Sequence, residues 1–128
     1  MTTRTITNLA LSPVQQLLMS EAVDQGPSLI FVADEKMNYV AVNLTACRVL
    51  GYTREELLGL AVIDVAVAPE APTLYDEMLR RRSHHGVTPI RTKDGRLLQL
   101  TYNACEVQVS GLPYWVSIGH VEDDSGES

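Results

Sequence analysis

Aromatic residues are scarce in this chain of 128 residues, because one Phe, one Trp and five Tyr together make up 5% of it. Such a composition predicts an aliphatic interior. We therefore expect an interior cavity to suit a fatty or otherwise apolar ligand better than a stacked planar one. The length predicts one domain that buries roughly two thirds of its unfolded surface and folds without disulfides.

Cysteine is also rare, with Cys47 and Cys105 only. The two could pair only if the fold brings them together, and the polar, threonine-rich residues 1–10 contain no apolar core of signal-peptide length. Cys47, between Ala46 and Leu50, is predicted to be a small buried apolar side chain with a raised pKa. No apolar run approaches the ~20 residues of a membrane span. These features predict a reduced, cytoplasmic protein.

Positive charge is in deficit, and the formal net charge of −6 at pH 7 argues against a nucleic-acid-binding protein. The basic residues are nevertheless clustered between positions 80 and 96, as Arg80, Arg81, Arg82, Arg91, Lys93 and Arg96. They are interpreted either as a solvated helix end followed by a hairpin turn, or as a docking patch for an acidic partner. Cations at a helix C-terminus contribute ~0.3–1 kcal/mol each.

Motifs of the common enzyme classes are missing as well. No serine lies in a nucleophile-elbow context, no Cys and His residues have metal-ligand spacing, and the glycines form no phosphate-binding loop. The paired acids Glu55 and Glu56 would point around a helix surface, where no apolar surroundings raise a pKa. We therefore predict that the protein is not an enzyme and binds no metal.

Two short helices with capping residues are predicted within NLTACRVLGYTREELLG, at positions 43–59. Asn43 can cap the first helix with its side-chain oxygen, and Gly51 can end that helix in the left-handed conformation. Thr53 and Glu56 have the spacing of a capping box for the second helix.

A longer helix is predicted over residues 12–25. Ser12 and Gln15 form its capping box, and Pro13 occupies the first helical position, where its missing N–H costs nothing. Its apolar positions form one stripe of Val14, Leu17, Leu18 and Ala22, with Met19 and Val23 beside it. This stripe is expected to be buried either against the body of the domain or against a second copy of the chain.

The remaining pattern predicts a sheet. The apolar run at residues 28–34 predicts a central strand, and residues 39–42 predict a second strand after a turn. A helix is predicted over residues 73–83, and His84 and His85 follow where it ends. All helices after the first strands then come from one crossover connection, which places them on one face of an antiparallel sheet.

The C-terminal third predicts two hairpins. Asp94-Gly95 is a strong signal for a tight turn, with Gly95 at positive φ, and Ser110-Gly111 predicts a second turn before a last strand at 114–121. Between them, residues 97–107 alternate in polarity. Leu98, Leu100, Tyr102 and Ala104 are predicted on one face, and Gln99, Thr101, Asn103 and Cys105 on the other.

This order of segments resembles the PAS family of sensor domains over roughly residues 28–123. The resemblance is carried by Val42-Asn43, Leu50-Gly51-Tyr52, Glu56-Leu57-Leu58-Gly59, Pro69-Glu70 and Lys93-Asp94-Gly95. It implies an α+β fold, in which a five-stranded antiparallel sheet of order 2-1-5-4-3 has helices on one face. It also implies dimerisation through a helix preceding the first strand, which is the position of residues 12–25.

We therefore expect three parts. Residues 1–27 would be a mobile arm and an amphipathic dimerisation helix, residues 28–123 the PAS domain, and residues 124–128 a disordered acidic tail. A ligand pocket is expected between sheet and helices, lined by Tyr75, Met78, Leu79, Leu98, Leu100 and Tyr102, with Asn43, Leu50 and Trp115 as further lining. The same residues would serve equally as an ordinary packed core.

Haem and flavin are not expected as cofactors. Haem-binding PAS domains use an axial histidine on the long helix, and residues 73–83 contain none. Light-sensing PAS domains carry the cysteine of their flavin adduct after the second capped helix, whereas Cys47 comes before it. In flavin-binding redox sensors of the family an asparagine and a tryptophan contact the flavin, but Asn43 is already explained as a helix cap and Trp115 as core.

These observations predict a cytoplasmic module that senses or relays a signal, dimerises and binds a small apolar ligand. A shift of the sheet or of the flanking helix would act on an output domain or a docked partner protein, without nucleic acid or membrane. The alternative is a ligand-free interaction or dimerisation module. A sensor would be stabilised by a metabolite or co-purify with a chromophore, and an interaction module would show neither.

Overall fold

A five-stranded antiparallel sheet forms the centre of the domain in the computed structural model, which describes residues 12–67 and 83–123. The strand order is β2-β1-β5-β4-β3, which confirms the predicted fold. The strands are β1 (Leu29–Ala33), β2 (Tyr39–Val42), β3 (Ser83–Arg91), β4 (Leu97–Val109) and β5 (Leu112–Asp123).

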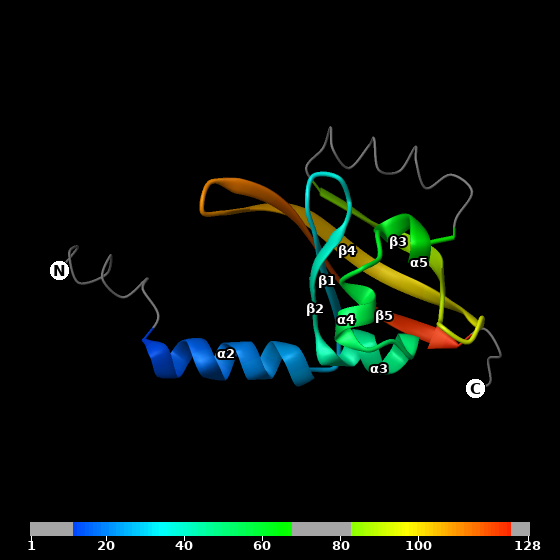
Figure 1. The fold of residues 1–128 in the computed structure, drawn as a ribbon, viewed down its shortest axis with the longest axis horizontal. Helices are drawn as coiled ribbons and strands as arrows, with labels where there is room; N and C mark the ends of the chain where they lie inside the picture. The colour runs from blue at the N-terminus through cyan, green and yellow to red at the C-terminus, as the bar shows by residue number, and fades with distance from the viewer. Residues whose placement is uncertain (1–11, 68–82, 124–128) are drawn as a thin grey trace.

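Within the described ranges, four helices accompany the sheet: α2 (Pro13–Gln25), α3 (Leu44–Leu50), α4 (Arg54–Leu57) and α5 (Val62–Val65). The three short helices gather over one side of the sheet, whereas α2 extends away from the rest of the domain (Figure 1). The turn α5 was not among the predicted helices. It begins without a side-chain hydrogen bond from its N-cap Ala61, so the sequence has no strong start signal there.

The predicted capping residues all act as expected. The Asn43 side chain accepts a hydrogen bond from the Ala46 N–H, and Gly51 ends α3 at φ 84°. The capping boxes of α2 and α4 are both formed. Each of these interactions spans three or four residues, so local chemistry alone was sufficient to locate the helix ends.

Asn43 also joins three segments that are distant in sequence. Its Oδ1 accepts a hydrogen bond from the Ile30 N–H at 3.0 Å, and its Nδ2 donates to the carbonyls of Val23 and Ser28, each at 2.8 Å. With the α3 cap, both donors and both acceptors of the amide are used, and the residue is 4% exposed. One buried side chain therefore connects the end of α2, the start of β1 and the start of α3.

The inner face of the sheet and the short helices enclose the core. Its buried members are Leu29, Phe31, Tyr39, Val42, Ala46, Cys47, Leu50, Leu57, Val65, Ile90, Leu98 and Leu100. The predicted alternation along β4 is confirmed, because Leu98, Leu100 and Ala104 are buried while Thr101 and Asn103 are exposed.

The two cysteines lie in different environments. Cys47 is buried in the core and Cys105 is exposed, and neither forms a disulfide. Burial raises the pKa of the Cys47 thiol, against the opposing effect of the nearby Arg54 guanidinium. The prediction of a buried, weakly acidic thiol is confirmed.

The β3–β4 turn is tied to α3. Gly95 has φ 95°, as predicted, and the Thr92 N–H donates to the Arg96 carbonyl at 2.8 Å. The Thr92 hydroxyl accepts from the Arg96 N–H at 2.9 Å. The Lys93 N–H donates to the Leu50 carbonyl at 2.8 Å, so the turn satisfies a carbonyl at the C-terminal end of α3.

Part of the basic cluster also lies at this turn. Lys93 pairs with Glu56 of α4 at 2.7 Å, and Arg96 lies 3.7 Å from Asp94. The hydrogen bond from Lys93, followed by one from the Thr53 backbone, lowers the pKa of Glu56. Exposed pairs of this kind contribute little to stability. Arg80, Arg81 and Arg82 lie outside the described residues.

The prediction for the segment before this turn is wrong in one respect. His84 and His85 were expected at a helix end, but they lie within β3, each opposite a residue of β4. The predicted helix at 73–83 falls outside the described residues except for Ser83, the first residue of β3. The long strand β4 supplies hydrogen-bonding partners along all of β3, and this pairing outweighs the local breaking tendency of Gly86 and Pro89.

The positive φ at Gly95 gives a test of the fold. Gly95→Val should lower the melting temperature, because a β-branched residue at positive φ is strained by ~1–3 kcal/mol. Gly95→Asn is the matched control, since Asn tolerates this region, and it should lose less than half as much. Equal melting temperatures for the Val and Asn variants in calorimetry would contradict this account of the turn.

The four hydrogen bonds of Asn43 predict a larger effect. Asn43→Ala should lower the free energy of unfolding by at least about 2 kcal/mol, because it leaves several buried backbone groups without partners. Asn38→Ala is the control. Asn38 is exposed, and this change should cost less than about 0.5 kcal/mol. Urea unfolding monitored by circular dichroism measures both, and similar midpoints for the two variants would exclude the structural role given to Asn43.

Candidate functional site

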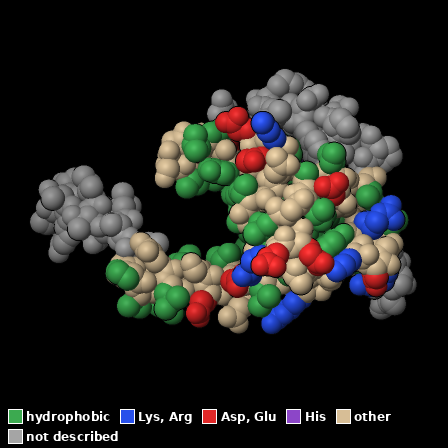
Figure 2. All heavy atoms as spheres, viewed as in Figure 1, with side chains coloured by type: hydrophobic (Ala, Val, Ile, Leu, Met, Phe, Trp, Pro, Cys, Tyr) green, Lys and Arg blue, Asp and Glu red, His purple; other side chains and the backbone are tan. Residues whose placement is uncertain are grey.

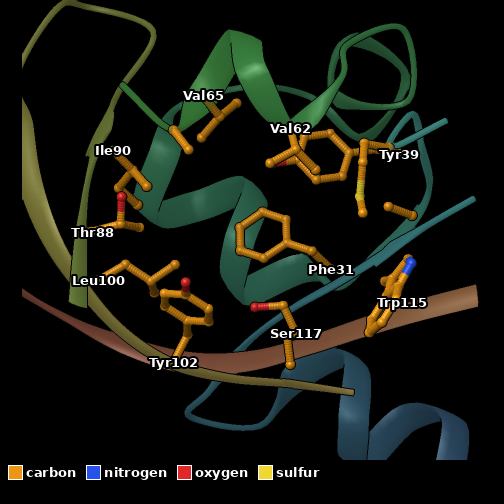
Figure 3. Close-up of a pocket in the computed structure, with 14 residues that line it drawn as sticks. Phe31, Tyr39, Val62, Val65, Thr88, Ile90, Leu100, Tyr102, Trp115 and Ser117 are labelled. Carbon is orange, nitrogen blue, oxygen red and sulfur yellow. The ribbon is translucent and has the colours of Figure 1, made fainter. Parts of the chain in front are cut away.

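A cavity of about 80 Å³ lies between the inner face of the sheet and α5. All five strands contribute side chains to its wall, and Val62 and Val65 of α5 close it from the opposite side (Figure 3). Its lining combines three kinds of side chain: aliphatic groups such as Ile90 and Leu100, aromatic rings and hydroxyl groups.

Aromatic rings make up much of the wall. Phe31, Tyr39, Tyr102 and Trp115 line the cavity, although the whole sequence contains only seven aromatic residues. The rings of Phe31 and Tyr39 lie with centroids 5.3 Å apart, tilted by 32°. The prediction of an aliphatic interior is therefore wrong at the cavity. Composition counts residues without placing them, and the sheet concentrates these four at one site.

Three hydroxyl groups line the same cavity, from Thr88, Tyr102 and Ser117. Figure 3 shows the hydroxyls of Tyr102 and Ser117 near one another, below the ring of Phe31. Burial raises the pKa of the Tyr102 phenol, so this hydroxyl remains protonated over a wider pH range and available as a donor.

Charge is absent from the described lining of the cavity, which contains no Asp, Glu, Lys, Arg or His. A charged ligand would lose its hydration there without gaining an ion pair. In the described part of the chain there is also no group of three or more His, Cys, Asp and Glu side chains that could hold a metal ion. The described part of the cavity wall therefore offers no partner to a charged group.

Three of the residues predicted to line the pocket are at the cavity, namely Leu100, Tyr102 and Trp115. Asn43, Leu50 and Leu98 lie elsewhere. The Asn43 amide points into the α2–β1 junction, while Leu50 and Leu98 are 0% and 3% exposed in the packed core. Tyr75, Met78 and Leu79 lie outside the described residues.

Sequence reasoning missed Phe31, Thr88 and Ser117 as lining residues. Alternation within β1 could have placed Phe31 on the same face as Ala33. The position of Ser117 follows only from the register of the sheet, in which it lies opposite Phe31 of β1 and Ala104 of β4. Thr88 was missed because β3 was not delimited.

The helix α2 carries a second feature, an exposed apolar stripe formed by Val14, Leu17, Leu18 and Ala22. The three larger side chains are 66%, 59% and 64% exposed, and no residue of α2 is buried. Hydrophobic side chains are visible on this projecting helix in Figure 2. The stripe was expected to pack either against the body of the domain or against a second copy of the chain. The described part of the domain does not cover it.

None of the helices in the described ranges combines the length and the apolar character needed to cross a bilayer.

Comparison with known proteins gives one family. A model of the PAS fold matches residues 17–118. A PAS domain of a two-component sensor histidine kinase is similar in structure, with a TM-score of 0.78 and 17% identity over 88% of this chain and 100% of that chain. The PAS domain of an HTR-like protein from Haloarcula marismortui has a TM-score of 0.78 and 16% identity, over 87% and 100% of the two chains.

A third similar structure is the PAS domain of nitrogen regulation protein NR(II) from Vibrio parahaemolyticus, with a TM-score of 0.70 and 13% identity over 82% of this chain and 98% of that chain. No curated protein matches the sequence at a significant level. The family match covers most of the chain, and the sheet order 2-1-5-4-3 agrees with it. The chain therefore belongs to the PAS fold family.

Proposed function

We propose that this PAS domain senses a small, largely apolar molecule in the cavity beside α5 and relays its presence through α2. PAS domains are in general sensory or regulatory modules rather than enzymes, and similar domains occur in a sensor histidine kinase and a nitrogen regulation protein. The observation that carries the proposal is the uncharged cavity with four aromatic rings in its wall. We also propose a cytoplasmic location, where the free thiols of Cys47 and Cys105 stay reduced.

The size of the cavity limits the ligand. Its volume of about 80 Å³ compares with ~300–1,000 Å³ for sites of drug-sized ligands. A molecule of a few non-hydrogen atoms, or one ring admitted by side-chain movement, is the class that fits. A cofactor of the size of haem or a flavin does not fit this volume.

A route from the cavity to α2 runs through β1. Phe31 lines the cavity, and the adjacent Ile30 N–H donates to Asn43, whose amide donates in turn to the Val23 carbonyl of α2. Asp24 of α2 adds contacts with the Leu44 N–H at 2.9 Å and with Arg54 at 2.5 Å. A ligand that displaces β1 would therefore alter the hydrogen bonds that set the direction of α2.

The exposed stripe of α2 supports a dimer, in which a change in the direction of α2 would be transmitted from one copy to the other. Burial of Leu17 and Leu18 between two copies would contribute ~1.5–3 kcal/mol for each side chain, and a twofold axis would bury the same stripe on both copies. A change in the direction of α2 would then alter the arrangement of the two copies. An attached output domain or a docked protein would respond to that arrangement.

The small volume of the cavity favours a second function. A PAS domain with a packed interior would act as a ligand-free interaction or dimerisation module, using α2 alone. The two functions differ in one measurable respect, since only a ligand-binding domain is stabilised against unfolding in proportion to ligand concentration.

Filling the cavity tests ligand binding. Toluene should raise the melting temperature of the wild type, because it binds only the folded state. Ala104→Leu should abolish that shift, since Ala104 lines the cavity and the larger side chain would occupy it. Thr101→Leu, on the exposed face of the same strand, is the control and should retain the shift. A wild type unaffected by toluene up to its solubility limit would favour the ligand-free module.

Charge introduced into the α2 stripe tests the dimer. We expect the Leu17→Glu, Leu18→Glu double variant to sediment as a folded monomer, because four carboxylates would be forced into the shared interface of two copies. Gln16→Glu, about 200° around the helix from both Val14 and Leu18, should remain dimeric. A monomeric wild type at high concentration, or an unchanged dimer in the double variant, would rule out this interface.

A further inference from the structure

The hydroxyl groups of β4 and β5 give the cavity a polar side, and we infer that its ligand is a neutral single-ring molecule bearing a hydroxyl group, which Tyr102 and Ser117 recognise. This inference rests on the proposed ligand-sensing function and specifies its chemistry. It follows from the placement of the hydroxyls, their lack of partners among the described residues, and the character of the remaining wall.

The hydroxyls come from three adjacent strands, β3, β4 and β5, and the register brings them onto one face. Thr88 lies opposite Leu100, and Ser117 lies opposite Ala104. These two positions of β4 flank Tyr102, two residues away on either side, and therefore point to the same face as Tyr102. Tyr102 therefore lies between Thr88 and Ser117 on this face, and Thr88 and Ser117 are two strands and four positions of β4 apart.

The hydroxyls are available to a ligand. None of the three forms a hydrogen bond with another residue of the described ranges, although Thr88 is only 7% exposed. Buried hydroxyl groups nearly always have a partner. A ligand with a group that both donates and accepts would supply partners to Tyr102 and Ser117 together.

Two glycines allow close packing around Tyr102. Gly86 of β3 and Gly119 of β5 are the residues directly opposite Tyr102 on its two sides. On the β3 side the ring of His84 lies beside the Tyr102 ring, with centroids 5.8 Å apart. At Gly119 a Cβ atom would lie 2.3 Å from the Thr101 carbonyl oxygen and 3.0 Å from Leu100 Cδ1, so this position requires glycine.

The rest of the wall selects a neutral ring. The described lining has no charged group, and Phe31, Tyr39 and Trp115 present aromatic surfaces that favour offset or edge-to-face contact with another ring. A volume of about 80 Å³ is below the ~150 Å³ of an apolar cavity that admits benzene. One ring is therefore the upper limit, and it enters with some movement of the lining side chains.

Phenol and toluene form a matched pair of probes, because they share one ring and differ in a hydroxyl against a methyl group. Trp115 lines the cavity and is the only tryptophan of the chain, so its indole N–H resonance reports occupancy of the site. We expect phenol to bind the full chain at least about 10-fold more tightly than toluene, with two or more hydrogen bonds gained. Benzoate, which is charged, should not bind.

Two nearly isosteric variants remove one of these hydroxyls each: Tyr102→Phe and Ser117→Ala. Each should weaken phenol binding by about 3- to 10-fold and leave toluene binding unchanged, whereas a loss of fold would affect both probes. Thr88→Val, which removes the more distant hydroxyl, is the matched control and should change the binding of neither probe. Equal affinities for phenol and toluene, with the variants without effect on either, would overturn this inference and leave ligand sensing intact. If neither probe shifts the indole resonance, ligand sensing in this cavity fails as well.

Discussion

The buried amide of Asn43 joins α2, β1 and α3 at one point of the domain. Its four hydrogen bonds connect it to Val23 in the last turn of α2, to Ser28 just before β1, to Ile30 within β1 and to Ala46 in the first turn of α3. Because donors and acceptors are all satisfied at 4% exposure, the junction is favourable only when every segment is in place. The position of α2 relative to β1 therefore depends on all four hydrogen bonds of Asn43.

The inner face of the sheet divides into two regions with different roles. Around Leu50, Leu57 and Leu98 the core is closely packed, with exposed fractions from 0% to 3%. Beside α5, large aromatic side chains surround a cavity with hydroxyl groups in its wall. A cavity of this kind lowers stability relative to a fully packed core, and this is the region to which we assign ligand sensing.

The helix α2 is attached to the rest of the domain at one end. It touches the domain mainly at its C-terminal end, through Asn43, Asp24 and the hydroxyl of Thr45, which donates to the Gly26 carbonyl. Its apolar stripe remains exposed in the described structure. A helix attached at one end amplifies small changes at its attachment point, and a second copy that covers the stripe would couple the two domains.

Local interactions were determined by the sequence itself. The caps at Ser12, Asn43 and Thr53, the left-handed Gly51 and Gly95, and the alternation of β4 each involve residues a few positions apart, so propensity and spacing were enough to predict them. The strand order was predicted from the resemblance to PAS domains. Only the tertiary structure decided which distant residues meet: the further partners of Asn43, the aromatic and hydroxyl groups at the cavity, and the strand that contains His84 and His85. These depend on sheet register and long-range pairing, where a shift of one residue exchanges the two faces, and no local pattern in the chain encodes them.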